Sequence, residues 1–289
     1  MIEIVEEDKD ANVWNGLAVV FDIDSGSWAD RSPLHDAAAQ GRLLALRTLI
    51  VQGHNVNVLT IDHVTPLHEA CLGDHVACAR ALIDAGANIN ASTMDGVTPL
   101  FNACSVGSMT CAELLLENGA RPQMLVYQPS PIHEATSRGH YGCVEALVTW
   151  GADVDMDIPH LGTALYTACV CQELECARKL LREGANVQKG RCLDSPLHAA
   201  AQKDCAAVVK LLLDFGADIN ARNPEYQRPV DVAPPSSVTE GLLLFYEASP
   251  RLLSQMCRQC IRGCVGRDRL HLLAHLPLPS RLQRFLQYK

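Results

Sequence analysis

The chain has 289 residues, 48% of them hydrophobic and 20% charged, and it carries a net charge of −9. It contains no run of 18 apolar residues, so the sequence excludes a membrane-spanning helix. The thirteen cysteines are an odd number, and the acidic N-terminus lacks the long apolar core of a secretory leader. These features disfavour a disulfide framework, and we expect a cytoplasmic protein with the nucleus as a second location.

Charge is divided unevenly between the body of the chain and its end. Residues 250–289 hold eight Lys or Arg and one Asp, a net charge of +7, so residues 1–249 carry −16. An acidic body repels phosphates, and the basic end lacks the interleaved aromatic residues of a nucleic-acid surface. We therefore expect no nucleic-acid partner.

A short motif recurs between residues 29 and 235, after an N-terminal segment, residues 1–28, that lacks it. The motif is Ser or Thr, then Pro, an apolar residue and most often His, and its copies begin at Ser32, Thr65, Thr98, Ser130, Thr163, Ser195 and, more weakly, Arg228. Successive second positions are 33, 33, 32, 33, 32 and 33 residues apart. Glycines keep the same register at Gly53, Gly86, Gly119, Gly151, Gly184 and Gly216. Two independent marks in one register indicate stacked repeats.

Each repeat predicts two helices and a turn. The Ser or Thr caps a helix by accepting a bond from a free backbone N–H, and Pro at the first helical position has no N–H to leave unpaired. An Ala four residues after the motif's second position lets neighbouring helices approach closely. A second helix with an apolar pair such as Leu82-Ile83 follows, and the glycine ends it in the left-handed conformation. Phe101 and Tyr166 replace the motif His, and Ala164 replaces Pro, so the third and fifth units must stabilise their turns differently.

The cysteines and histidines of the repeats follow the same register, which favours structural roles over metal binding. Cys71, Cys104 and Cys169 share one position in the repeat, and Cys78, Cys111, Cys143 and Cys176 share another. Cysteine behaves as a small buried hydrophobe, so these two rows fit a seam between helices. The histidines of the motif are expected to form hydrogen bonds around the capping turn; they are His35, His68, His133 and His198.

The sequence shows no motif of an enzyme active site. It contains no phosphate-binding loop, nucleophile elbow or His-Glu-x-x-His motif. We expect no catalytic residues, no metal and no cofactor.

A separate pattern occupies the C-terminal forty residues. After Pro234-Pro235 and a predicted helix over Val238–Ala248, apolar and cysteine residues fall at steps of three and four, at positions 253, 256, 257, 260, 261 and 264. This spacing describes one face of an amphipathic helix. Cys257, Cys260 and Cys264 also permit a metal-site interpretation, but no fourth ligand has suitable spacing, and helical periodicity already explains the cysteine positions.

Both parts of the chain resemble known families. The 33-residue period with Thr-Pro-Leu-His resembles the ankyrin repeat, in six good units and a degenerate seventh. The terminal helix resembles the elongin-binding box of the SOCS box, whose pattern Leu-x-x-Leu-Cys-Arg-x-x-Ile-Arg matches at every position except Met256, where Met replaces Leu; the matching residues are Leu253, Met256, Cys257, Arg258, Ile261 and Arg262. Downstream, Leu276, Pro277, Leu278 and Pro279 resemble the cullin-selecting part of that box.

Together these resemblances identify the chain as a member of the ankyrin repeat and SOCS box family, most similar to the subgroup of members five, nine, eleven and thirteen. They imply an all-α fold with an N-terminal segment at 1–28, an ankyrin solenoid at 29–248 and a small helical SOCS box at 249–289. They also imply a substrate receptor that binds elongin B and elongin C through Leu253, Met256, Cys257 and Ile261, and cullin-5 with its RING protein through residues 276–279.

The target protein is not readable from the sequence. One position of the first helices carries Asp36, Glu69, Asn102 and Glu134, which would form an acidic stripe facing a basic target if they were not an ordinary solvated face. A different class of function stays open beside the ligase receptor: an ankyrin scaffold that tethers or sequesters a partner without ubiquitin transfer.

Overall fold

The computed structural model describes residues 30–123, 130–249 and 253–288, and within these ranges the regular structure is helical, with two isolated β-bridges. The helices pair in chain order. Their bounds are α2 Pro33–Ala39, α3 Leu43–Val51, α4 Pro66–Leu72, α5 Val76–Asp84, α6 Pro99–Val106, α7 Met109–Glu117, α8 Pro131–Ser137, α9 Tyr141–Thr149, α10 Ala164–Val170, α11 Leu174–Arg182, α12 Pro196–Gln202, α13 Ala206–Asp214, α14 Pro229–Val232 and α15 Val238–Ala248.

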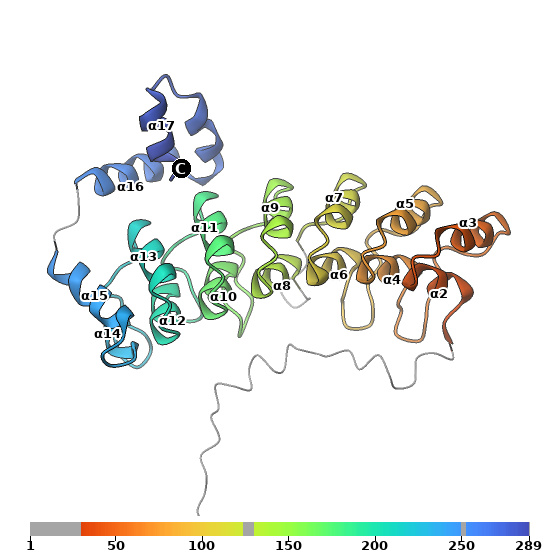
Figure 1. Ribbon diagram of the computed structural model, residues 1–289, viewed down its shortest axis with the longest axis horizontal. Coiled ribbons are helices and arrows are strands. Elements are labelled where there is room, and N and C mark those ends of the chain that lie inside the picture. The colour runs from red at the N-terminus through yellow and green to blue at the C-terminus, as the bar shows by residue number, and fades with distance from the viewer. Residues whose placement is uncertain (1–29, 124–129, 250–252, 289) are drawn as a thin grey trace, which may run out of the picture.

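The paired helices stack into a solenoid. The first helices, from α2 to α14, lie side by side in one row, and the second helices, from α3 to α13, lie in another (Figure 1). The seventh unit is degenerate, because α14 has only four residues and its partner α15 closes the stack. Fold class and repeat number therefore agree with the prediction from the motif spacing.

The C-terminal part adds three short helices beside the end of the stack. They are α16 Leu253–Val265, the 3-10 helix η2 Arg267–His275 and α17 Ser280–Leu286. They lie over the second helices α11 and α13 (Figure 1). Within the described ranges no helix combines the length and apolar character needed to cross a membrane.

The core runs without interruption through the repeats. The alanine after each motif, from Ala37 to Ala200, is almost completely buried, so adjacent first helices approach at their smallest side chains. Leucines of the second helices, such as Leu82 and Leu115, fill the space between the two rows. Since each helix buries its apolar face against the next unit, neighbouring units stabilise one another.

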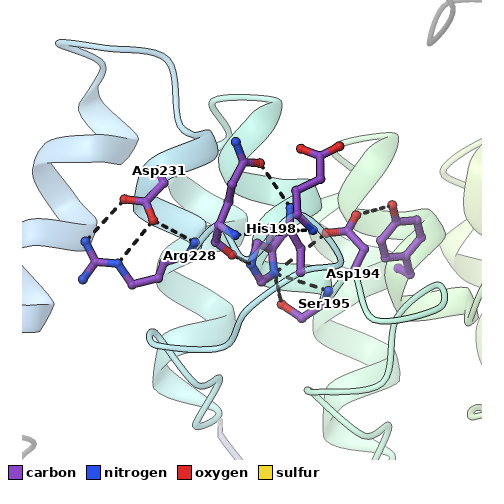
Figure 2. A network of polar contacts seen from close by, with 9 residues as sticks. Asp194, Ser195, His198, Arg228 and Asp231 are labelled. Atoms are coloured by element: carbon purple, nitrogen blue, oxygen red, sulfur yellow. Dashed lines mark hydrogen bonds and ion pairs between the residues drawn. The ribbon is translucent and has the colours of Figure 1, made fainter.

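The motif histidines form the predicted hydrogen bonds around the capping turn, and the structure shows that they also join consecutive repeats. Nδ1 of His68 accepts from the backbone N–H of Thr65 at 3.1 Å, so its Nε2 carries the proton and donates to the carbonyl of Val97 in the next unit, also at 3.1 Å. His198 repeats this arrangement with Ser195 and with the carbonyl of Gln227, at 3.0 Å (Figure 2). Each histidine therefore fixes its own capping turn and the following turn together.

The fifth unit replaces this link by another. The hydroxyl of Tyr166 donates to Oδ2 of Asp194 at 2.7 Å, and the guanidinium of Arg191 lies 5.5 Å from the centre of the Tyr166 ring (Figure 2 draws this hydroxyl contact). Thr163 at the cap donates to the carbonyl of Lys189 at 2.8 Å. Burial and the Asp194 carboxylate raise the pKa of Tyr166 above its usual value, so the hydroxyl stays a donor.

Replacing Tyr166 by Phe removes only the hydroxyl and its bond to a carboxylate. We expect Tyr166→Phe to lower the free energy of unfolding by about 1.5–2 kcal/mol, the usual contribution of a bond to a charged group. Tyr226, exposed in a neighbouring turn, provides the matched control, and Tyr226→Phe is expected to change stability by less than about 0.5 kcal/mol. Urea unfolding followed by circular dichroism measures both; equal effects would contradict the assigned role.

The two cysteine rows lie in the seam between helices. All seven cysteines of the rows are buried, whereas Cys192, Cys257, Cys260 and Cys264 are exposed. Burial raises the pKa of Cys176 to about 12 and also raises that of Cys169, so both are protonated thiols at neutral pH. The interpretation of the rows as packing residues is confirmed.

Candidate functional site

Helix α16 presents one apolar face outward. Its residues Leu253, Met256 and Ile261 are 76%, 51% and 41% exposed, and Cys257 is exposed as well. The helix ends at Val265, where Gly266 follows at φ +78°, a conformation that glycine adopts readily. The four residues predicted to bind elongin therefore lie on one helix and are accessible together.

The opposite face of α16 packs on the ankyrin stack. Arg262 donates to the carbonyl oxygens of Leu181 and Arg182, at 3.2 and 2.9 Å, and to that of Leu286, at 3.1 Å. Gln255 donates to Oδ1 of Asp214 at 3.0 Å. Burial lowers the pKa of Arg262, and three carbonyl oxygens accept hydrogen bonds from its guanidinium. The helix is therefore fixed through its polar side while the apolar side stays open.

A shallow groove of about 430 Å³ lies between α16 and η2. Apolar and cysteine side chains line most of it, among them Ile261, Cys264, Leu272 and Leu276. The groove joins the outward face of α16 to the segment 276–279. An apolar side chain of a partner fits such a groove, because burial there removes apolar surface from water.

The segment predicted to select a cullin connects η2 to α17. Leu276 and Leu278 are half-buried, whereas Pro277 and Pro279 are exposed. Gln283 of α17 donates to the carbonyl of Leu276 at 2.7 Å, and Pro279 stands at the N-terminus of that helix. The two prolines fix φ, and the hydrogen bond holds the segment against α17.

The predicted acidic row on the first helices is largely neutralised inside the protein. Glu69 is buried and forms an ion pair with Arg31, and Glu134 pairs with Arg138 at 2.6 Å. Burial raises the pKa of Glu69. Asn102 donates to the carbonyl of His68 at 3.3 Å. Asp36 is half-buried, so the row presents less unpaired negative charge to a target than the sequence alone indicates. The role of the row in target binding stays a prediction.

The structure adds exposed residues that sequence reasoning did not single out. Leu59, Ile61 and Met94 are exposed apolar side chains in the turns between the first three repeats. The backbone N–H of Met94 donates to the carbonyl of Asp62 at 3.1 Å, which places these turns side by side. In the sequence, these residues could have been found as apolar residues within otherwise polar turns.

The described residues contain no group of three or more His, Cys, Asp or Glu side chains arranged to hold a metal ion. Cys257, Cys260 and Cys264 follow the helical spacing of α16, and no His joins them.

Comparisons with known proteins agree with this geometry. Residues 34–126, 94–158 and 132–223 match the family of ankyrin repeats in three copies, and residues 249–287 match the SOCS box. Ankyrin repeat and SOCS box protein 5 of Oryctolagus cuniculus is 68% identical over 91% of this chain and 80% of its own length. Human ankyrin repeat and SOCS box protein 11 is 60% identical over 92% of this chain and 82% of its own length.

Two solved structures share the fold of the ankyrin part. The crystal structure of the human ASB11 ankyrin repeat domain aligns with a TM-score of 0.73 and 53% identity, covering 76% of this chain and all of that one. The ankyrin repeat domain of Bcl-3 aligns with a TM-score of 0.65 and 29% identity over 74% of this chain and 98% of its own.

A SOCS box implies binding to elongin B/C and a cullin in general, and its combination with ankyrin repeats supports a non-catalytic adaptor that recognises substrates. The chain belongs to the ankyrin repeat and SOCS box family.

Proposed function

We propose that this chain is the substrate-recognition subunit of an elongin B/C–cullin-5–RING ubiquitin ligase, which brings a target protein to ubiquitin transfer and proteasomal degradation. The observation that carries the proposal is the outward apolar face of α16, where Leu253, Met256, Cys257 and Ile261 are accessible together. A group of neighbouring exposed apolar side chains usually marks a surface that binds a partner.

Elongin binding would bury these side chains as central anchors. Leu253 and Cys257 lie one helical turn apart, so both enter one partner surface. A few central apolar residues usually supply most of the affinity of such an interface. The groove between α16 and η2 lies beside them and offers a place for a partner side chain.

Cullin-5 and its RING protein would contact the segment from Leu276 to Pro279, whose two prolines are exposed. The ankyrin stack would hold the target, with Asp36, Glu69, Asn102 and Glu134 as the proposed contact row. No residue of this chain needs to perform chemistry in this mechanism. The complex accelerates transfer by raising the effective concentration of a target lysine near the charged conjugating enzyme.

Capture of purified elongin B–C by the full chain tests the proposal. Leu253→Asp places a charge at the centre of the proposed interface, and because Leu253 is exposed, the change should not disturb the fold. We expect the dissociation constant to rise at least about 30-fold, as for loss of a hot-spot residue. Cys257→Phe on the same face is expected to weaken binding similarly.

Leu244→Asp is the matched control, since Leu244 is an exposed leucine on α15, outside the SOCS box. It should leave capture unchanged. If the wild-type chain captures no elongin B–C, the ligase proposal fails, and a tethering or sequestering scaffold becomes the better account. If Leu253→Asp binds as tightly as the wild type, the mapped interface is wrong.

A further inference from the structure

The SOCS box meets the ankyrin stack at the ends of two second helices. Six repeats end their second helix in a glycine with φ between +86° and +94°. At Gly53, Gly86, Gly119 and Gly151, no described atom lies within 4 Å of an added Cβ. At Gly184, such a Cβ would lie 2.8 Å from Leu270, and at Gly216 it would lie 2.8 Å from Gln259. The SOCS box therefore approaches the bare backbone where α11 and α13 end.

Arg262 occupies the end of α11. The last carbonyl groups of a helix have no partner within it and carry a partial negative charge. Arg262 donates to two of them, those of Leu181 and Arg182, and also to the carbonyl of Leu286 in α17. One guanidinium thus connects three segments: α16, the last turn of α11 and the end of α17.

Tyr288 occupies the end of α13. Its ring stacks on that of Phe215, with centroids 3.6 Å apart and planes 14° from parallel, and the guanidinium of Arg258 lies 4.1 Å from the Tyr288 ring centre. Its hydroxyl donates to the carbonyl of Asp214 at 3.0 Å, and its own carbonyl accepts from Arg182 at 2.8 Å. Stacking, cation–π contact and two hydrogen bonds all restrain this single residue.

Charge adds a third contact. Arg267 of η2 pairs with Asp153 at 3.1 Å and with Asp155 at 2.7 Å, both in the turn after α9. The basic end of the chain therefore meets the acidic body directly.

We infer that these contacts form a docking clamp, defined by Arg262, Tyr288, Arg258 and Phe215, which holds the SOCS box in one orientation on the ankyrin stack. Arg258 and Arg262 belong to the same helix as the proposed elongin contacts but act on the opposite face as positioning residues. A partner can cover the outward face while the clamp stays closed. This last step rests on the proposed function: the clamp would hold the bound ligase subunits at a fixed distance from, and in a fixed orientation to, the repeats that bind the target.

Single-molecule fluorescence transfer within the full chain tests the clamp. Dyes are attached through unnatural amino acids at positions 44, on exposed α3, and 282, on exposed α17. We expect the wild type to show one narrow distance distribution, both alone and with elongin B–C. Tyr288→Ala removes the stacked ring and both hydroxyl and ring contacts, and it is expected to broaden the distribution at least about twofold without changing elongin affinity by more than about threefold.

The glycine positions supply a second variant with a matched control. Gly184→Ala with Gly216→Ala introduces two methyl groups into the contact between the SOCS box and the ankyrin stack, beside the clamp. Gly86→Ala with Gly119→Ala introduces the same backbone strain where no described atom is near. The first pair should broaden the distribution, and the second should leave it narrow while lowering stability to a similar degree. A broad wild-type distribution, or equal distributions for the two pairs, overturns the clamp. Because both dyes are in this chain, failure of elongin capture would leave the clamp measurement intact.

Discussion

Lowering the pH from 7 to 5 is expected to reduce the free energy of unfolding of the ankyrin stack by about 4 kcal/mol through His68 and His133 alone. Burial lowers the pKa of each from 6.5 to about 4, against the opposing effect of the carbonyls of Val97 and Gly162. Each Nε2 donates to its carbonyl, and each Nδ1 faces a capping hydroxyl, so the neutral ring fits the folded state.

The direction follows from proton binding in the two states. Between pH 6.5 and pH 4 the unfolded chain binds protons at these histidines and the folded chain does not, so stability rises with pH. The stabilisation is complete above the unfolded pKa, decreases as the pH falls below it, and changes no further below about pH 4. From pH 7 to pH 5 each histidine accounts for about 2 kcal/mol.

Urea unfolding at pH 7 and pH 5, at constant ionic strength, measures this effect. The control is the double variant His68→Gln, His133→Gln, whose side chains keep polar groups but do not titrate. The variant should be less stable at pH 7 and lose about 4 kcal/mol less on acidification. Comparing the two chains cancels the carboxyl groups, including Glu69, whose pKa is raised by burial. An equal loss in both would contradict the assignment to the histidines.

Leu115→Ala is expected to lower the free energy of unfolding by about 2–5 kcal/mol. Leu115 is 0% exposed in α7, and this helix packs against both α5 and α9, so the vacated space weakens two repeat interfaces at once. Hydrogen exchange should increase in the units on both sides of α7, because each unit is stabilised by its neighbours.

Leu44→Ala provides the same chemical change at a position 81% exposed, also on a second helix. It should alter stability by less than about 0.5 kcal/mol. Chemical denaturation of the two variants side by side decides the matter. If both variants lowered the free energy of unfolding by a similar amount, burial in the interior of the stack would not be the source of its stability.

Repetition made the solenoid predictable. The capping turns, the buried alanines and the two cysteine rows recur at 32–33 residues, so each unit supports the interpretation of the next. The hydrogen bonds of the motif histidines to their capping turns were predictable in the same way, whereas their bonds to the carbonyl groups of the next repeat appeared only in the structure. The α16 face followed from helical periodicity in the same way.

The role of the charged residues was harder to predict from the sequence than the repeat was. Glu69 and Glu134 appeared as members of an acidic row, yet Arg31 and Arg138 neutralise them in the fold. Arg138 lies four residues after Glu134 on its helix, a spacing that the sequence displays. Arg31 lies 38 residues from Glu69, in another repeat, and no periodic mark connects the two. The partner of the Tyr166 hydroxyl, Asp194, was hidden for the same reason.

By itself the amino-acid sequence determined the repeat, its caps, its buried rows and the accessible face of the C-terminal helix, since all of these depend on spacing within one or two units. Only the tertiary structure decided where the SOCS box rests. Arg262 reaches Leu181 across 81 residues, and Tyr288 reaches Asp214 across 74. These pairings join two architectures with different periods, so no register predicts them, and three-dimensional packing alone brings the helix ends, the aromatic rings and the guanidinium groups together.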